Sequence, residues 1–151
     1  MSIFHSMNVS ASGMTAQRLR MDVATSNMAN ANTTRAVLNE KGEWQQPYRR
    51  KMVDLQPQEP EFRAIFQQAL QTYRASGVKA VEIVDDETPF KQVFNPNHPD
   101  ANEAEYVQMP NVDPLEETID MMSATRSYEA NITSLNASKG MLMKALEIGK
   151  Q

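Results

Sequence analysis

Residues 113–149 read DPLEETIDMMSATRSYEANITSLNASKGMLMKALEIG, a stretch that carries the marks of one long helix. Asp113 suits the N-cap, because its carboxylate can accept hydrogen bonds from the free amides of the first turn. Pro114 suits the first helical position, and Glu116 and Glu117 place negative charge at the positive end of the helix dipole. Such a helix would extend roughly 50 Å at about 1.5 Å per residue. No small domain buries that length along its whole side, so we expect a packing partner.

Apolar residues recur every seven positions along this stretch, in two series four residues apart, as in a coiled coil. Thr125 and Lys139 interrupt the second series. Much of the remaining surface is Ser, Thr and Asn, whose side chains compete for backbone hydrogen bonds, so we expect the helix to gain its order by packing. The alternative is a long surface helix on an ordinary domain. The predicted C-terminal assembly seam consists of Met121, Tyr128, Ile132, Leu135, Leu142 and Leu146.

The first 34 residues carry a second repeat of seven, formed by Met7, Met14, Met21 and Met28. An organellar transit peptide is also acid-poor and Arg-bearing, but a removed peptide has no reason to carry a seam that matches the other end of the chain. We therefore predict that the N-terminal and C-terminal helices pair as an antiparallel coiled-coil arm. The four methionines complete the predicted seam.

The middle of the chain predicts a small β-rich region of short strands and loops. Alternating apolar residues indicate a hairpin or strand pair over 44–55 and strands over 78–84 and 88–94. The basic run Arg49–Lys51 fits either a solvated strand edge or a contact to an acidic neighbour. The prediction is an α+β chain of three parts. These are an N-terminal helix at 1–34, a β-rich region at 35–111 with a linker and short helix at 56–76, and a C-terminal helix at 112–151.

The composition offers little for catalysis or for ligand binding. The chain has no cysteine and a formal net charge of −4, so thiol chemistry and a strongly basic nucleic-acid surface are excluded. His5 and His98 are far apart in sequence, and Asp85–Glu87 lacks the spacing of a calcium loop. No phosphate-binding glycine loop, nucleophile elbow or zinc motif is present. We predict no enzyme activity, no cofactor or metal, no nucleic-acid partner and no small-molecule substrate.

Several motifs resemble one family. The run Ser26–Thr34, SNMANANTT, resembles the Asn-Asn-x-Ala-Asn-x-x-Thr stretch of bacterial flagellar rod, hook and hook-associated proteins. The blocks Asn95–Ala101 and Tyr106–Val112, together with Tyr128–Asn131, are similar to the basal-body rod proteins of that axial family. One departure is Glu105, which stands where the family usually has glycine before the tyrosine. Because glycine allows backbone angles that glutamate disfavours, we expect a reshaped turn there.

The resemblance implies a structural subunit of the proximal flagellar rod, located in the basal body outside the cytoplasmic membrane. Such a subunit polymerises with itself and with other axial proteins into the drive shaft between motor and hook. It also implies passage through the flagellar type III export apparatus. Phe62 and Phe66 resemble the motif that engages the export gate, although a plain core-facing helix fits the same residues. The alternative function is a soluble helical adaptor or chaperone that binds one partner helix, which would melt sharply as a folded monomer.

Overall fold

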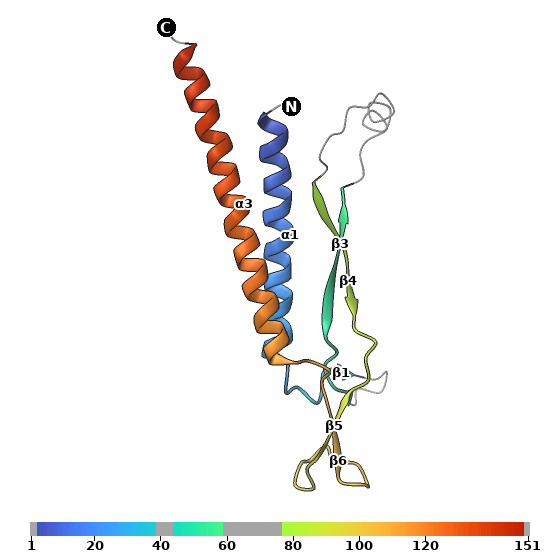
Figure 1. Cartoon of the computed structure of the whole chain (residues 1–151). Coiled ribbons are helices and arrows are strands. Elements are labelled where there is room, and N and C mark those ends of the chain that lie inside the picture. The colour runs from blue at the N-terminus through green and yellow to red at the C-terminus, as the bar shows by residue number, and fades with distance from the viewer. Residues whose placement is uncertain (1–2, 39–43, 59–76, 150–151) are drawn as a thin grey trace. The chain divides into compact units, whose positions relative to one another are not determined.

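A computed structural model of the chain describes residues 3–38, 44–58 and 77–149 (Figure 1). Two long helices enclose the strands in sequence, so the described chain is α+β, as predicted. Phe62, Phe66 and most of the predicted linker and short helix lie outside the described residues. The elements in chain order are α1 Ile3–Ala29, β1 Val37–Leu38, β2 Trp44–Gln46, β3 Lys51–Pro57, β4 Val78–Asp85, β5 Lys91–Phe94, β6 Tyr106–Met109 and α3 Pro114–Ile148.

The end of α1 and the start of α3 are set by the capping residues that the sequence predicts. Asp113 caps α3, since its Oδ1 accepts a hydrogen bond from the Leu115 amide at 3.0 Å. At the end of α1, the Asn30 amide and its side-chain Nδ2 both donate to the Ser26 carbonyl, at 3.1 and 2.9 Å. The Asn-rich run therefore ends α1 by bonding its own backbone, as its composition predicts.

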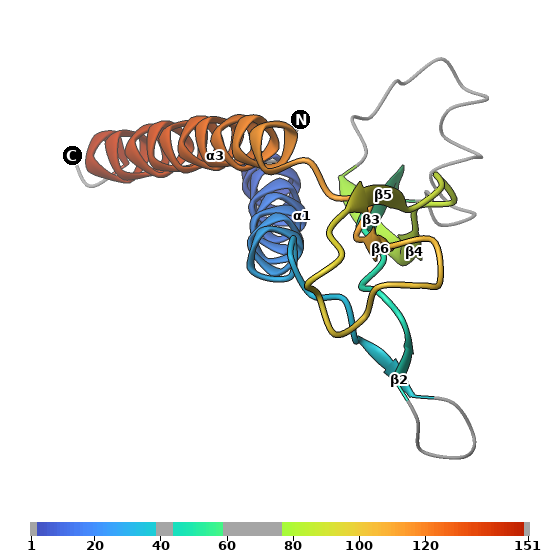
Figure 2. The same cartoon turned by 90° about the horizontal axis from the view of Figure 1, so that it is seen from below.

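The strands form three two-stranded sheets, β1–β2, β3–β4 and β5–β6. The predicted hairpin over 44–55 is wrong, because β2 pairs with β1 and β3 pairs with β4. The β5–β6 pair is antiparallel, with Phe94 opposite Tyr106 and their rings in edge contact at 5.5 Å. Viewed from below, β2 lies apart from β5 and β6, so these strands make separate ribbons (Figure 2).

Glu105 closes the turn before β6 in the left-handed conformation, with φ of 65°. Its amide donates to the Asn102 carbonyl at 2.9 Å, and its carbonyl accepts from the Asn95 amide at 3.0 Å. The Asn102 side chain accepts from the amides of Ala104 and Tyr106 and so holds the turn from inside. Whether this turn differs from that of relatives with glycine here stays a prediction. Glutamate adopts the backbone angle that glycine would supply, at a cost in strain.

The chain forms two compact units. Unit 1 takes its described residues from Met1–Leu19, Asp54–Glu82 and Ser123–Gln151, and unit 2 consists of Arg20–Val53 and Ile83–Met122. In unit 1, the Oγ atoms of Ser6 and Ser138 are 3.4 Å apart, and Gly13 lies against the Asn131 side chain. From Ser6 to Gly13 the chain advances along α1, while the contacted residues go back along α3 from Ser138 to Asn131. The two helix segments of unit 1 therefore run antiparallel (Figure 1).

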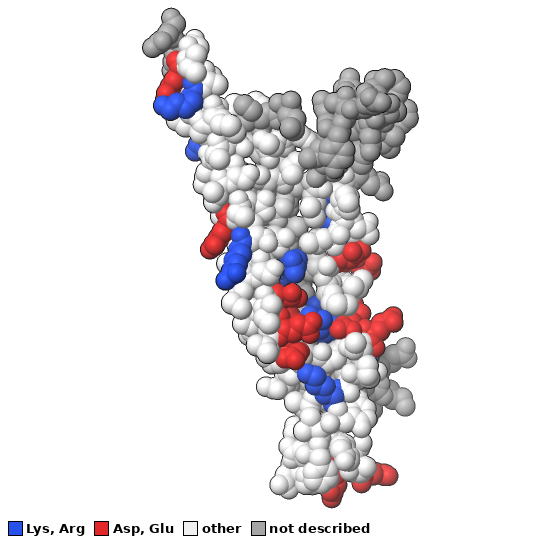
Figure 3. All heavy atoms as spheres, viewed as in Figure 1, with Lys and Arg blue, Asp and Glu red and all other residues white. Residues whose placement is uncertain are grey.

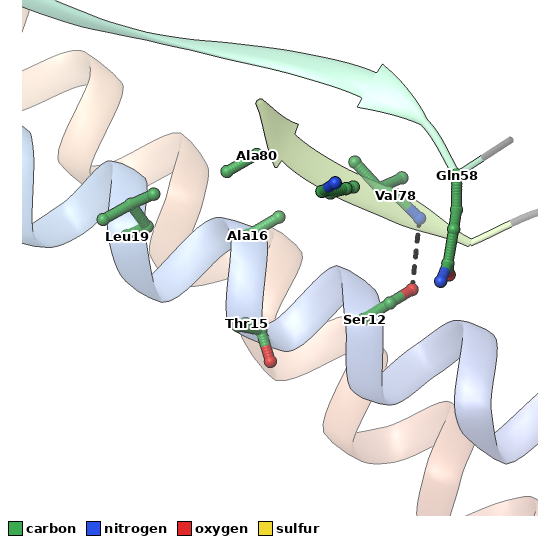
Figure 4. Close-up of a pocket in the computed structure, with 8 residues that line it drawn as sticks. Ser12, Thr15, Ala16, Leu19, Gln58, Val78 and Ala80 are labelled. Atoms are coloured by element: carbon green, nitrogen blue, oxygen red, sulfur yellow. Dashed lines mark hydrogen bonds between the residues drawn. The ribbon is translucent and has the colours of Figure 1, made fainter. Parts of the chain in front are cut away.

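Small residues bring the elements of unit 1 into close contact. Ser10, Ala16, Ala124 and Ser138 are its buried helical residues. Gly77 approaches α1 so closely that a Cβ there would lie 2.5 Å from the Ser12 Oγ. That Oγ accepts a hydrogen bond from the Val78 amide at 3.1 Å (Figure 4). Beside this contact lies an open groove of about 450 Å³, lined by Ser12, Thr15, Ala16, Leu19, Gln58, Val78, Lys79 and Ala80.

Candidate assembly surfaces and the buried Arg50 cluster

Asn27 lies in the last turn of α1 and is the most completely bonded side chain of unit 2. Only 1% of its surface is exposed. Its Nδ2 donates to the Lys51 carbonyl at 2.8 Å and to Glu117 Oε2 at 3.0 Å. Its Oδ1 accepts from the Lys51 amide at 3.0 Å and from the Tyr48 hydroxyl at 2.9 Å. All four hydrogen-bonding positions of the amide are used, so Asn27 fixes the end of α1 to β3 and to the first turn of α3.

Arg50 precedes β3, and its side chain is only 12% exposed. Its Nε donates to Glu117 Oε1 at 2.6 Å, while its Nη1 lies 3.5 Å from Asp86 Oδ2 and its Nη2 lies 3.3 Å from Glu116 Oε1. Burial opposes the charged form, but the hydrogen bond to Glu117 and the charges of Glu117 and Glu116 raise the pKa of Arg50 above its ordinary value. The guanidinium is therefore held by carboxylates from two separate elements.

Asn111 and Asp86 complete this arrangement. The Asn111 Oδ1 accepts from the Arg50 amide at 2.8 Å, and its Nδ2 donates to Thr88 Oγ1 at 2.8 Å and to the Asp86 carbonyl at 3.2 Å. A hydrogen bond from the Thr88 amide, with a further contribution from Arg50, holds the pKa of the Asp86 carboxyl below its usual value. We call Asn27, Arg50, Asp86, Asn111 and Glu117 the Arg50 cluster. Every buried side-chain nitrogen and oxygen of the described residues has a hydrogen-bond partner.

The Arg50 cluster is a positioning site, because its groups are saturated by one another. A buried ion pair adds little net stability compared with an apolar core, but it strongly disfavours arrangements that leave one charge alone. The first turn of α3 is thus restricted to the position in which Glu117 meets both Arg50 and Asn27. The interpretation of Arg49–Lys51 as a solvated edge does not hold for Arg50, whose acidic neighbours belong to its own chain.

The sequence analysis does not predict the Arg50 cluster, although it singles out both Glu117 and Asn27 for other reasons. Glu117 was interpreted through the helix dipole alone, and Asn27 through its effect on the end of α1. The sequence signal that could have revealed the cluster is the spacing of Glu117 from Ala124, Asn131 and Ser138, which recur every seven residues. In the single chain these positions form the inner side of α3. Glu117, Ala124 and Ser138 are buried, and Asn131 lies against Gly13.

The predicted seam residues are less deeply buried than Glu117, Ala124 and Ser138. The methionines at 7, 14, 21 and 28 are half-buried, as are Met121, Tyr128, Leu135 and Leu142. Ile132 is 36% exposed and Leu146 is 66% exposed in the single chain. On the face shown in Figure 3, most of the helical surface of unit 1 is white, with charged atoms at a few places along α3. Whether the seam residues contact neighbouring subunits stays a prediction.

The part of the chain that the structure describes holds neither a metal-binding cluster nor a candidate membrane span. No set of three or more His, Asp or Glu side chains there is placed to hold a metal ion. Within the same residues, neither helix has an apolar run that could serve as a membrane span. Among the features of the described residues are the Arg50 cluster and the exposed apolar side chains of the helices.

The two segments that carry these features match known protein families. The model described as Flagella basal body rod protein matches residues 7–36, which include Asn27. The model described as Flagellar basal body rod FlgEFG protein C-terminal matches residues 103–148, which include Asn111 and Glu117. Two long helices that each lie largely within a matched rod segment thus define the class of the chain: it is a flagellar basal-body rod protein.

Full-length relatives narrow this class further. The chain is similar to the flagellar basal-body rod protein FlgC of Bacillus subtilis, with 57% identity over 99% of this chain and 100% of the relative. Identity is 40% to the FlgC protein of Borreliella burgdorferi, over 98% of both chains, and 36% to that of Escherichia coli O157:H7, over 99% of this chain and 100% of the relative. The chain belongs to the FlgC family of structural subunits of the flagellar basal-body rod.

Proposed function

We propose that α1 and α3 form an antiparallel coiled-coil arm that polymerises with copies of itself and with other axial proteins into the drive shaft between motor and hook. The observation that carries this proposal is the distribution of side chains on the helices. Their fully buried residues are small or polar, whereas large apolar side chains such as Ile132, Met141 and Leu146 remain exposed. Exposed apolar surface of this kind marks an interaction site.

Burial of these side chains between subunits would supply the free energy of assembly, at about 25 cal/mol per Å² of apolar surface. Ordering of the helices on assembly offsets part of this gain, so the free subunit stays soluble until it reaches a template. Torque would then pass through many interlocked side chains rather than through one bond. The subunit would reach the rod through the type III export apparatus, with Phe62 and Phe66 as the candidate contact to the export gate.

The proposal is tested by placing a charge in the predicted seam. We expect Ile132→Asp and Leu135→Asp each to abolish incorporation into rods, because each would bury a carboxylate in a dry contact. Ser134→Asp adds the same charge at an exposed position outside both apolar series, and we expect normal incorporation. Incorporation is measured in isolated basal bodies and by swimming motility, with circular dichroism as the check on folding. Normal motility of either seam variant would contradict the proposed seam.

A further inference from the structure

The first turns of α3 present an acidic and apolar face to solvent. Leu115, Ile119 and Met122 follow the spacing of one helix face, and each is at least half exposed. Glu116 and Asp120 flank these residues on one side, with side chains 60% and 47% exposed. We call these five residues the acidic end of α3. Glu116 and Asp120 both lie within ion-pair distance of Arg50, and Asp120 also of Arg20. With Glu117 and Asp86 added, the carboxylates around these two arginines still outnumber them.

The last turns of the same helix carry the opposite charge. Lys139 and Lys144 are exposed there and outnumber Glu147, which pairs with Lys144 at 2.7 Å. Because Ser6 contacts Ser138 while α1 begins at Ile3, the last turns of α3 extend beyond α1 within unit 1 (Figure 1). Four large apolar side chains of these turns are more than half exposed, whereas Leu142 is half-buried. The basic end of α3 consists of Lys139, Met141, Met143, Lys144, Leu146 and Ile148.

The helix dipole explains only part of this pattern. Carboxylates near the start of a helix and lysines near its end are stabilising in any isolated helix. The dipole gives no reason for Leu115, Ile119 and Met122 to face water beside the carboxylates, or for Met141 and Ile148 to face water beside the lysines. Both ends therefore combine charge with apolar surface that needs cover, and the two charges are opposite in sign.

We propose that the acidic end of α3 in one copy docks on the basic end of α3 in the next copy. This inference rests on the proposed function and names the surfaces that it would use. Opposite charges favour the pairing of unlike ends, and like charges disfavour a symmetric pair of equal ends. A contact between two different patches leaves one patch of each kind unused at the ends of any open assembly, so it can propagate from copy to copy.

The absence of cysteine from the sequence makes a cross-linking test direct. One set of full-length chains carries a single cysteine at the acidic end (L115C, I119C or M122C), and the other carries one at the basic end (M141C, L146C or I148C). The two ends of one α3 cannot reach each other, since a helix rises about 1.5 Å per residue and a disulfide needs Cα atoms within about 7 Å. Any disulfide between the ends therefore joins two copies.

We expect at least one mixed pair to form disulfide dimers at least tenfold faster than either variant alone. Disulfides confined to equal ends, or none in any pair, would overturn the head-to-tail contact. Rod incorporation of the same variants is scored separately. Rods that contain the chain without links between unlike ends would overturn this contact and leave the proposed function standing, whereas a chain that enters no rod would remove both.

Charge reversal tests the electrostatic part of the contact. In the most reactive mixed pair, we expect K144E in the basic-end copy to slow cross-linking about tenfold. K79E reverses an exposed lysine outside α3 and is the matched control, with no change expected. Equal slowing by K144E and K79E would show that net charge alone acts and would overturn the complementarity of the two ends.

Discussion

At the scale of single residues, Glu105 and Glu117 show two ways in which a side chain meets its surroundings. Glu105 stays exposed and bears a backbone angle that a side chain disfavours. Glu117 is buried, and both of its carboxylate oxygens accept hydrogen bonds. A change at Glu105 should therefore relieve a cost, and a change at Glu117 should create one.

We expect Glu105→Gly to raise the free energy of unfolding by about 0.5–1 kcal/mol. Glycine relieves the left-handed strain, although its greater freedom in the unfolded chain offsets part of the gain. Glu103→Gly is the control in the same loop. Since Glu105 is the only residue other than glycine with positive φ among those described, Glu103 has no such strain to lose. Urea denaturation measures both variants, and a Glu105→Gly protein no more stable than the parent would contradict the strain.

We expect Glu117→Gln to lower the free energy of unfolding by roughly 1–3 kcal/mol. The carboxylate accepts from Arg50 Nε on one oxygen and from Asn27 Nδ2 on the other, so the NH₂ of glutamine must face a donor. Glu116→Gln alters a neighbouring carboxylate that is mostly exposed, and we expect a loss of at most about 1 kcal/mol there. Equal losses in the two variants would mean that the buried carboxylate has no special role.

At the scale of elements, close approach in unit 1 depends on residues without bulk. Gly77 lies against Ser12, and Gly13 lies against Asn131. A side chain at position 77 would meet the Ser12 Oγ, which accepts a hydrogen bond from the Val78 amide. The contact between Gly77 and Ser12 therefore has no room to adjust. By contrast, a Cβ at Gly140 meets nothing within 4 Å. Gly77 and Gly140 should therefore respond oppositely to replacement by alanine.

We expect Gly77→Ala to lower the free energy of unfolding by about 1–3 kcal/mol through overpacking. Gly140→Ala should raise it by up to about 1 kcal/mol, because alanine is the better helix former. Adding Ser12→Ala to Gly77→Ala removes the clashing Oγ, so the loss in the double variant should be smaller than the sum of the single losses. Denaturant unfolding of the parent, Ser12→Ala, Gly77→Ala and the double variant measures these losses. Losses that simply add would contradict the steric explanation.

Local patterns predicted the elements well and their pairing less well. Asp113, Pro114 and the seven-residue repeat predicted α3, and the Asn-rich run predicted the end of α1, because caps and periodicity are local properties. The pairing of β2 with β1, and of β3 with β4, depends on contacts between distant residues and was missed. The same holds for the Arg50 cluster, in which Glu117 meets a residue 67 positions away. The inner series on α3 consists of small or polar residues, so apolar periodicity does not reveal it.

At the scale of the whole molecule, the chain combines one firmly bonded unit with helical segments whose large apolar residues remain uncovered. The Arg50 cluster holds the end of α1 and the start of α3 in unit 2 through saturated, buried groups. The helical segments of unit 1 meet through serine, glycine, alanine and asparagine. The fully buried residues of that second contact are small, and its large side chains are at most half-buried, so we expect it to depend on neighbouring subunits in the rod.

Amide hydrogen exchange, compared between the free subunit and isolated rods, tests this dependence most directly. We expect Ile3–Leu19 and Ser123–Ile148 to exchange rapidly in the free subunit and slowly in rods, while the Arg50 cluster is protected in both. Slow exchange of both helical segments in the free subunit, unchanged on assembly, would show that they are stable without neighbours and would contradict the account.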